Sequence, residues 1–108
     1  MASGFNGQRF AFHGYLPVPH EECRSAIVAR ERESRSQNMT QIFIETPYRN
    51  DALLQTFIES CADETQLCVA ADLTLASESV RCSSIGRWQA GHTKIGRRPS
   101  VFLLYAGK

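Results

Sequence analysis

Short apolar runs of strand length alternate with helix-forming segments along this chain, and that alternation limits the fold more than any other feature. Residues 39–45, 66–72 and 100–105 are rich in β-branched, aromatic or small apolar side chains, which is typical of buried strands. We predict strands over 9–15, 39–45, 66–72, 78–83 and 100–105, helices over 20–37 and 50–62, and one helical turn over 84–88. This order indicates an α/β fold, a single domain with a mixed β-sheet of about five strands flanked by helices.

The two predicted helices differ in how much apolar surface they carry. The helix over 20–37 is rich in charged residues and has only a thin apolar stripe around Cys23 and Ile27, so we expect it on the outside, in light contact with the core. The second helix has a wide apolar face, which consists of Leu53, Leu54, Phe57, Ile58 and Cys61. This face predicts that the second helix packs directly on the sheet.

Composition and charge exclude several classes of protein. No apolar run approaches the roughly 18 residues that a membrane-spanning helix needs, and the first residues lack the pattern of a secretion signal. We therefore expect a cytoplasmic protein with no membrane partner. The 12 Lys and Arg against 11 Asp and Glu give a net charge of +1, which predicts no general affinity for polyanions. From Arg81 onward the charged residues are all basic, so this segment either meets a phosphate or an acidic neighbouring domain, or is a solvated loop.

The cysteines and histidines do not form a metal-binding pattern. Cys23, Cys61, Cys68 and Cys82 include no C-x-x-C pair, whereas zinc ribbons and fingers need two close pairs. Cys61 and Cys68 lie at apolar positions, where a free thiol packs as a small hydrophobic group. The three histidines lie far apart in the sequence. We therefore expect no metal site and four reduced cysteines.

Polar residues follow two of the predicted strands, at the point where each strand ends. The segment ETPYR at residues 45–49 follows one strand, and DLT at residues 72–74 follows another. Ligands of open α/β sheets bind outside the carboxyl ends of strands, so these clusters are candidates to line one groove. Each residue also has an ordinary structural explanation, since Thr46 suits a helix start, Arg49 a surface cation and Asp72 a turn. The chain contains no G-x-S-x-G, H-E-x-x-H or G-x-G-x-x-G motif, so its catalytic residues stay unknown.

Four segments taken in order resemble the tetrapyrrole (corrin/porphyrin) methylase superfamily. They are FHGYLP at residues 12–17, QIFIETPYRN at 41–50, VAADLT at 69–74 and PSVFLLY at 99–105. The branch that looks most similar is that of the ribosomal RNA small-subunit 2′-O-methyltransferases. The resemblance covers nearly the whole chain, but it corresponds to the carboxyl-terminal half of such an enzyme. Residues 1–108 are thus expected to be its carboxyl-terminal α/β domain, without the amino-terminal domain that carries the family's Gly-rich cofactor loop.

The resemblance implies a cofactor and a set of residues that contact it. The superfamily binds S-adenosylmethionine in a cleft between two α/β domains. By resemblance, Glu45 and Thr46 at one strand end, and Ala70 and Ala71 in the next strand, contact the cofactor largely through the backbone. Short side chains at these two alanines let a flat ring approach the chain. Pro99, before the last strand, is a further candidate.

The same resemblance implies a substrate side and a type of reaction. Tyr48 and Arg49 would face the cleft and contact the substrate, where an Arg side chain suits phosphate. The reaction implied is direct methyl transfer, which needs alignment more than a covalent nucleophile. The acceptor implied is ribosomal RNA or, as an alternative, a tetrapyrrole precursor. A non-catalytic interaction module of the same fold is a third hypothesis.

A carboxyl-terminal half without its partner is expected to be inactive by itself. The missing partner, its own amino-terminal domain, would leave apolar surface uncovered. We therefore expect the domain to bind that partner or to form a homodimer.

Overall fold

The computed structural model describes residues 9–45, 49–71, 79–91 and 100–107, and it confirms the predicted α/β fold. Its elements in chain order are β1 (Phe10–Tyr15), α1 (His20–Gln37), β2 (Thr40–Glu45), α2 (Asn50–Ser60), β3 (Gln66–Ala71), β4 (Ser79–Ser84), α3 (Ile85–Gly91) and β5 (Ser100–Tyr105). Within these residues, five strands form one mixed sheet and three helices accompany it. No helix in the described ranges is long and apolar enough to cross a membrane.

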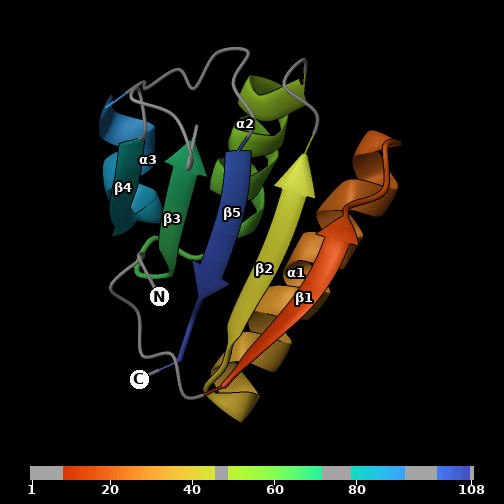
Figure 1. Ribbon diagram of the computed structural model, residues 1–108, viewed down its shortest axis with the longest axis vertical. Coiled ribbons are helices and arrows are strands. Elements are labelled where there is room, and N and C mark those ends of the chain that lie inside the picture. The colour runs from red at the N-terminus through yellow and green to blue at the C-terminus, as the bar shows by residue number, and fades with distance from the viewer. Residues whose placement is uncertain (1–8, 46–48, 72–78, 92–99, 108) are drawn as a thin grey trace.

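The last strand of the chain, β5, occupies the centre of the sheet. The strand order is β1-β2-β5-β3-β4. Only β1 and β2 are parallel, with α1 as their crossover, and every other neighbouring pair is antiparallel. Figure 1 shows the three helices side by side behind the sheet, with α1 behind β1 and β2 and α3 behind β4. The helix layer therefore covers one face of the sheet.

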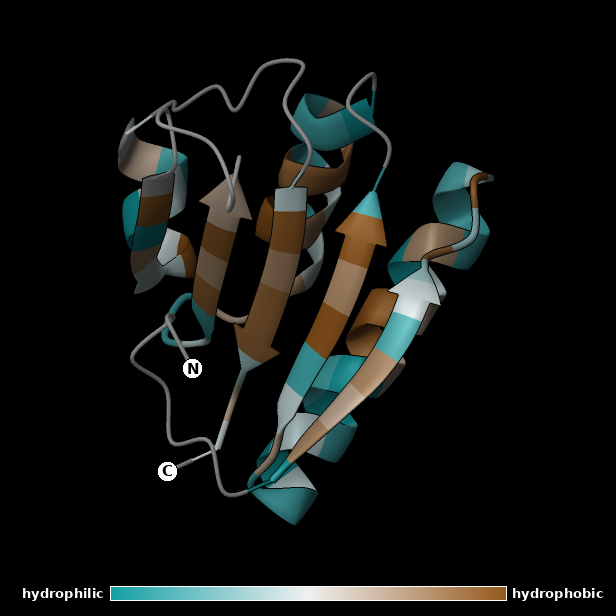
Figure 2. Ribbon diagram, in the orientation of Figure 1, coloured by the Kyte–Doolittle hydropathy of each residue, from teal (hydrophilic) through white to brown (hydrophobic). Residues whose placement is uncertain are grey.

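The hydrophobic core lies between the sheet and this helix layer. Phe57 of α2 packs against Phe43 of β2 and Phe102 of β5, with ring centroids 5.8 and 5.6 Å apart. Trp88 of α3 is buried and donates its indole N–H to the main-chain oxygen of Leu67 at 2.8 Å. Colouring by hydropathy shows that β3 and β5 are apolar along most of their length (Figure 2). The prediction that the third strand is buried on both faces is confirmed, because residues 67–71 are all buried.

Helix α1 contacts the rest of the domain through polar groups as well as apolar ones. The buried carboxylate of Glu31 accepts hydrogen bonds from the N–H of Ala62 at 2.8 Å and from the hydroxyl of Thr65 at 2.5 Å. Ser34, also buried, accepts a hydrogen bond from the N–H of Ala106 at 2.8 Å. The prediction of an outer helix in light apolar contact therefore holds only for the first half of α1, because the second half is anchored by buried polar groups.

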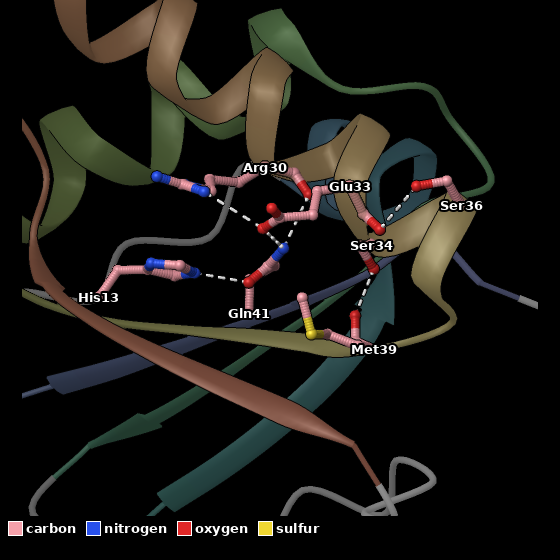
Figure 3. A network of polar contacts seen from close by, with 7 residues as sticks. All are labelled: His13, Arg30, Glu33, Ser34, Ser36, Met39 and Gln41. Atoms are coloured by element: carbon pink, nitrogen blue, oxygen red, sulfur yellow. Dashed lines mark hydrogen bonds and ion pairs between the residues drawn. The ribbon is translucent and has the colours of Figure 1, made fainter.

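A polar network joins α1 to the two parallel strands, and Figure 3 shows it at close range. Gln41 of β2 is fully buried and lies at its centre. The side-chain N–H group of Gln41 donates to the Glu33 carboxylate at 2.7 Å, and its amide oxygen accepts from Nε2 of His13 at 2.5 Å. Arg30 completes the network with an ion pair to Glu33 at 3.1 Å. The buried amide thus has a partner on both of its polar atoms.

A β-bulge in β1 brings His13 into this network. The register between β1 and β2 shifts between Phe12 and Gly14, so that His13 is the extra residue. Gly14 has a φ of 72°, in the left-handed region that favours glycine. Beyond the bulge, Tyr15 pairs with Ile44.

The expectation of four reduced cysteines is wrong for two of them. Cys68 and Cys82 are directly opposite each other in the β3–β4 pairing and form a disulfide. The sequence did not reveal that the two strands pair in this register. Cys23 and Cys61 are free, as expected. Burial raises the pKa of the Cys61 thiol, and the neighbouring Glu31 carboxylate raises it further.

The Glu31 contacts generate a prediction about stability. Glu31→Ala removes the acceptor for the Ala62 N–H and the Thr65 hydroxyl, so the free energy of unfolding should fall by about 2 to 3 kcal/mol in urea denaturation. The control is Glu22→Ala on the exposed side of the same helix, which should change it by less than about 0.5 kcal/mol. Equal losses in the two variants would show that the Glu31 contacts do not anchor α1.

The Gln41 network generates a prediction about pH. The hydrogen bond from Gln41 lowers the pKa of Glu33 below its ordinary value, with a further lowering from Arg30. Because this pKa is lower in the folded chain, the ionised carboxylate stabilises the fold above its ordinary pKa, and that contribution is lost as the pH falls through the lowered value. Gln41→Leu should raise the pKa of Glu33 in an NMR titration. Gln55→Leu, at an exposed position of α2, should leave this pKa unchanged. An unchanged Glu33 pKa in Gln41→Leu would refute this explanation.

Candidate functional site

The strand register places two predicted site residues, Glu45 and Ala71, in one row across the sheet with Ser100 between them. Glu45 at the end of β2 pairs with Ser100 at the start of β5, and Ala71 at the end of β3 pairs with the same Ser100. Glu45 and Ala71 are thus two strand spacings apart, about 10 Å. In Figure 1 this row lies along the upper edge of the sheet, where β2 and β3 end and β5 begins. We call Glu45, Ser100 and Ala71 the strand-end row.

An ion pair fixes one end of the strand-end row. Glu45 is only 6% exposed, and its carboxylate lies 3.3 Å from the guanidinium of Arg49, the residue before α2. The second nitrogen of that guanidinium donates to the main-chain oxygen of Val18 at 3.4 Å. Arg49 therefore connects the end of β2 to the loop between β1 and α1. The structure thus brings together two residues that the sequence proposed for different roles, one for the cofactor and one for the substrate.

A buried hydrogen bond supports the middle of the row. Asn50, the first residue of α2, donates its side-chain N–H to the hydroxyl of Ser100 at 3.2 Å, and both residues are buried. Sequence reasoning missed both as site residues, because it treated Asn50 only as a helix start and Ser100 only as a strand start. No local signal connects two residues that are 50 positions apart.

The other end of the row has short side chains. Ala71 lies on the helix side of β3, next to Ser100, and Ala70 lies on the opposite face, next to Val101. Both alanines are buried. Their methyl groups extend little beyond the backbone, and with 5% and 1% of their surface exposed, neither alanine presents open surface. The predicted contribution of Ala70 and Ala71 through the backbone stays a prediction.

Three predicted site residues lie outside the described residues. They are Thr46, Tyr48 and Pro99, and the DLT segment at 72–74 lies outside as well. Their roles stay predictions. Within the described residues, no group of three His, Cys, Asp or Glu side chains is arranged to hold a metal ion.

A groove of about 320 Å³ lies beside Arg49, between the first turns of α1 and the outer side of α2. His20 and Glu59 face each other across it at 3.8 Å, and Cys23 is also part of its lining. Burial raises the pKa of the Cys23 thiol, an effect that Arg49 partly offsets. A thiol with a raised pKa is protonated at neutral pH and is a poor nucleophile. The arrangement near the row therefore suits binding rather than covalent catalysis.

Comparison with solved structures identifies the fold. The methyltransferase CobJ matches 96% of this chain with a TM-score of 0.61 and 15% identity, over 44% of its own length. Uroporphyrin-III C-methyltransferase from Thermus thermophilus, complexed with S-adenosylhomocysteine, matches 92% of the chain with a TM-score of 0.57 and 10% identity, over 42% of its length. The cobalt precorrin-4 methyltransferase CbiF matches 92% with a TM-score of 0.56 and 14% identity, over 41% of its length.

The chain thus has the fold found in part of these methyltransferases and spans less than half of their length. No family model and no curated protein matches its sequence. These likenesses support the tetrapyrrole methylase fold that the sequence resembles. The ribosomal RNA branch stays a prediction.

The Glu45–Arg49 pair generates a prediction about coupling. Because Glu45 is buried, Arg49→Ala removes an ion pair from a buried carboxylate and should lower the free energy of unfolding by about 2 kcal/mol. Glu45→Gln and Arg49→Ala together should cost less than the sum of the two single changes, by about 1 kcal/mol in a double-mutant cycle. Additive losses would show that the ion pair does not stabilise this edge of the sheet.

Proposed function

We propose that this chain is the carboxyl-terminal domain of an S-adenosylmethionine-dependent methyltransferase and forms one wall of its cofactor cleft. The observation that carries the proposal is the strand-end row, because β5 aligns the ends of β2 and β3 at one edge of the sheet. Support comes from the shared fold with methyltransferases, one of which was solved with S-adenosylhomocysteine. Those proteins are more than twice as long as the segment they share with this chain, so the proposal includes an amino-terminal domain as the second wall.

The residues of the strand-end row suit a flat, charged cofactor. Ala70 and Ala71, though buried, add only methyl groups beside the backbone of β3, and Glu45 and Arg49 provide a paired negative and positive group nearby. We assign cofactor contact to Glu45, Ala70 and Ala71, with Thr46 and Pro99 as further predicted contacts. When bound, the cofactor supplies an electrophilic methyl group on a sulfonium.

The roles of the chain's own residues are to bind and to orient. The buried Asn50–Ser100 hydrogen bond holds the start of α2 against β5, and so fixes the position of Arg49 beside the row. Glu45 already accepts from Arg49, so it is better placed to hold that cation than to act as a general base. Correct alignment of donor and acceptor can by itself supply a large part of the rate enhancement in a transfer of this kind.

We propose a tetrapyrrole precursor as the acceptor. Two of the structurally similar proteins are named for uroporphyrin-III and for cobalt precorrin-4, which favours this class over ribosomal RNA. Arg49 lies at the edge where such an acceptor would enter, and Tyr48 stays a predicted contact. Part of the Arg49 side chain is exposed. The planar guanidinium can form paired hydrogen bonds with a carboxylate or a phosphate group.

The proposal is tested by titrating S-adenosylhomocysteine into the 108-residue chain and recording amide NMR spectra. Because the chain provides only one wall of the cleft, we expect weak binding, with a dissociation constant in the millimolar range. The largest changes in amide chemical shift should occur at Glu45, Ala71 and Ser100. No shift at millimolar ligand, or shifts only at the opposite edge near Gln66 and Tyr105, would contradict the proposal. Either result would favour a non-catalytic interaction module of the same fold.

A matched pair of variants on β3 sharpens this test. Ala70 and Gln66 lie on the same strand and face, at opposite ends. Ala70→Leu adds bulk next to the strand-end row, on the opposite face of β3, and should weaken the S-adenosylhomocysteine shifts about ten-fold, whereas Gln66→Leu should leave them unchanged. Equal effects of the two variants would show that the ligand does not bind at the strand-end row.

A further inference from the structure

The two sulfur atoms of the Cys68–Cys82 disulfide differ in their access to solvent. Cys68 is fully buried, whereas Cys82 lies at an exposed position of β4. The two residues face each other across the β3–β4 pairing and are 14 positions apart in the sequence. In thiol–disulfide exchange a thiolate attacks a sulfur atom that it can reach. A thiol in solution therefore reaches this disulfide at Cys82 rather than at Cys68.

Strand β4 has few attachments to the rest of the sheet. In Figure 1 it forms the left edge of the sheet, and among the described residues its only sheet neighbour is β3. Three of its six residues are serine, and Val80 is its only β-branched or aromatic residue. Residues of those two kinds are the ones that stabilise strands by packing on a sheet. We therefore expect the cross-strand disulfide to contribute much of the stability of β4.

The carboxyl-terminal end of β4 is anchored independently of the disulfide. It continues into α3, whose first residue, Ile85, donates its main-chain N–H to the oxygen of Thr65 at 2.8 Å. Trp88 of α3 holds the helix to β3 through its hydrogen bond to Leu67. The guanidinium of Arg81, in the middle of β4, lies 4.5 Å from the centre of the Trp88 ring. None of these contacts requires the bond between the two cysteines.

The amino-terminal end of β4 lies against the candidate site. Ser79 pairs with Ala71 of the strand-end row, and Val80 pairs with Ala70. The disulfide lies between this end and the anchored end, and it joins β4 to β3 covalently. Breaking the disulfide therefore removes a constraint from the part of β4 that borders the strand-end row.

We propose that the Cys68–Cys82 disulfide is an exchange site for a dithiol, and that its reduction releases the amino-terminal end of β4 from the strand-end row. In the cytoplasm, which is the compartment predicted from the sequence, disulfides are rare and are usually transient, catalytic or redox-sensing. An exposed sulfur on an edge strand suits a reversible bond of this kind. Control of cofactor binding by this reduction rests on the proposed function, because the strand-end row is the proposed wall of the cleft.

The exchange proceeds in two steps. First, a thiolate of the dithiol forms a bond to Sγ of Cys82, and the bond between the cysteines breaks. Its electron pair passes to Sγ of Cys68, which takes up a proton. Second, the other thiol of the reductant loses its proton and attacks its own sulfur in the mixed disulfide, which releases Cys82 as a thiolate that is then protonated. The dithiol becomes a disulfide, and the two cysteines gain the two electrons that it loses.

Amide hydrogen exchange in the 108-residue chain, measured by NMR before and after treatment with dithiothreitol, tests the release of β4. Protected amides of residues 79–81 should exchange about ten-fold faster in the reduced chain, because a disulfide limits the open states of the segment that it closes. Protected amides of Ser83 and Ser84 should change by less than about three-fold, since α3 anchors that end.

Two variants give matched controls for this measurement. Cys82→Ser removes the exposed sulfur, so it should show the faster exchange without dithiothreitol and should not respond to the reagent. Cys61→Ala removes a free cysteine and leaves the disulfide intact, so it should respond to dithiothreitol like the wild type. If Cys82→Ser does not fold, the reduced wild type still carries the test.

Peptide mass spectrometry of the oxidised chain, quenched with acid after incubation with reduced glutathione, identifies the sulfur that is attacked. We expect glutathione attached to Cys82. An adduct confined to Cys68 would overturn the assignment of the exchange site. Equal exchange rates for residues 79–81 before and after reduction would overturn the release of β4. Global unfolding of the reduced chain would do the same, because the proposal requires a folded reduced form.

Titration of S-adenosylhomocysteine into the oxidised and the reduced chain tests the link to the cofactor wall. We expect weaker binding to the reduced chain. Equal affinities would overturn this link and leave the proposed function intact, because the ligand still binds. Binding to neither form would contradict the proposed function, and the amide exchange rates would still decide whether reduction releases β4.

Discussion

The pairing of β5 with both β2 and β3 is the interaction on which the other features of this domain depend. The final strand inserts between two strands that precede it, antiparallel to each. This insertion completes the sheet, places Phe102 in the centre of the core and brings the ends of β2 and β3 to the same Ser100. The candidate site is therefore a direct consequence of the position of β5 in the sheet.

Because the helices lie on one face of the sheet, the two faces of the domain differ (Figure 1). The strand-end row lies at the edge where β2 and β3 end, and the Arg49 ion pair and the Asn50 hydrogen bond fix it from the helix side. The exposed side chains of Phe12 and Tyr15 lie on the opposite side of the sheet, where the bulge at His13 places them on the same side of β1.

The amino-acid sequence predicts the parts of this structure that depend on local periodicity. The apolar spacing of the second helix correctly predicted that Leu53 and Phe57 pack in the core. Contacts between distant residues left no periodic signal. The Cys68–Cys82 disulfide depends on the register between β3 and β4, and the Asn50–Ser100 hydrogen bond depends on how the start of α2 packs on β5. The charge pattern likewise predicted an outer helix over residues 20–37, whereas Glu31 of that helix is buried and accepts hydrogen bonds from Ala62 and Thr65.

The central claim is that the aligned ends of β2 and β3 form a wall of a cofactor cleft. The most direct measurement is of intermolecular nuclear Overhauser effects between S-adenosylhomocysteine and the methyl groups of the chain. The account predicts contacts from the ligand to the methyl groups of Ala70 or Ala71. Contacts confined to Ala52 and Thr56, in the groove between α1 and α2, would place the ligand away from the strand ends and contradict the claim.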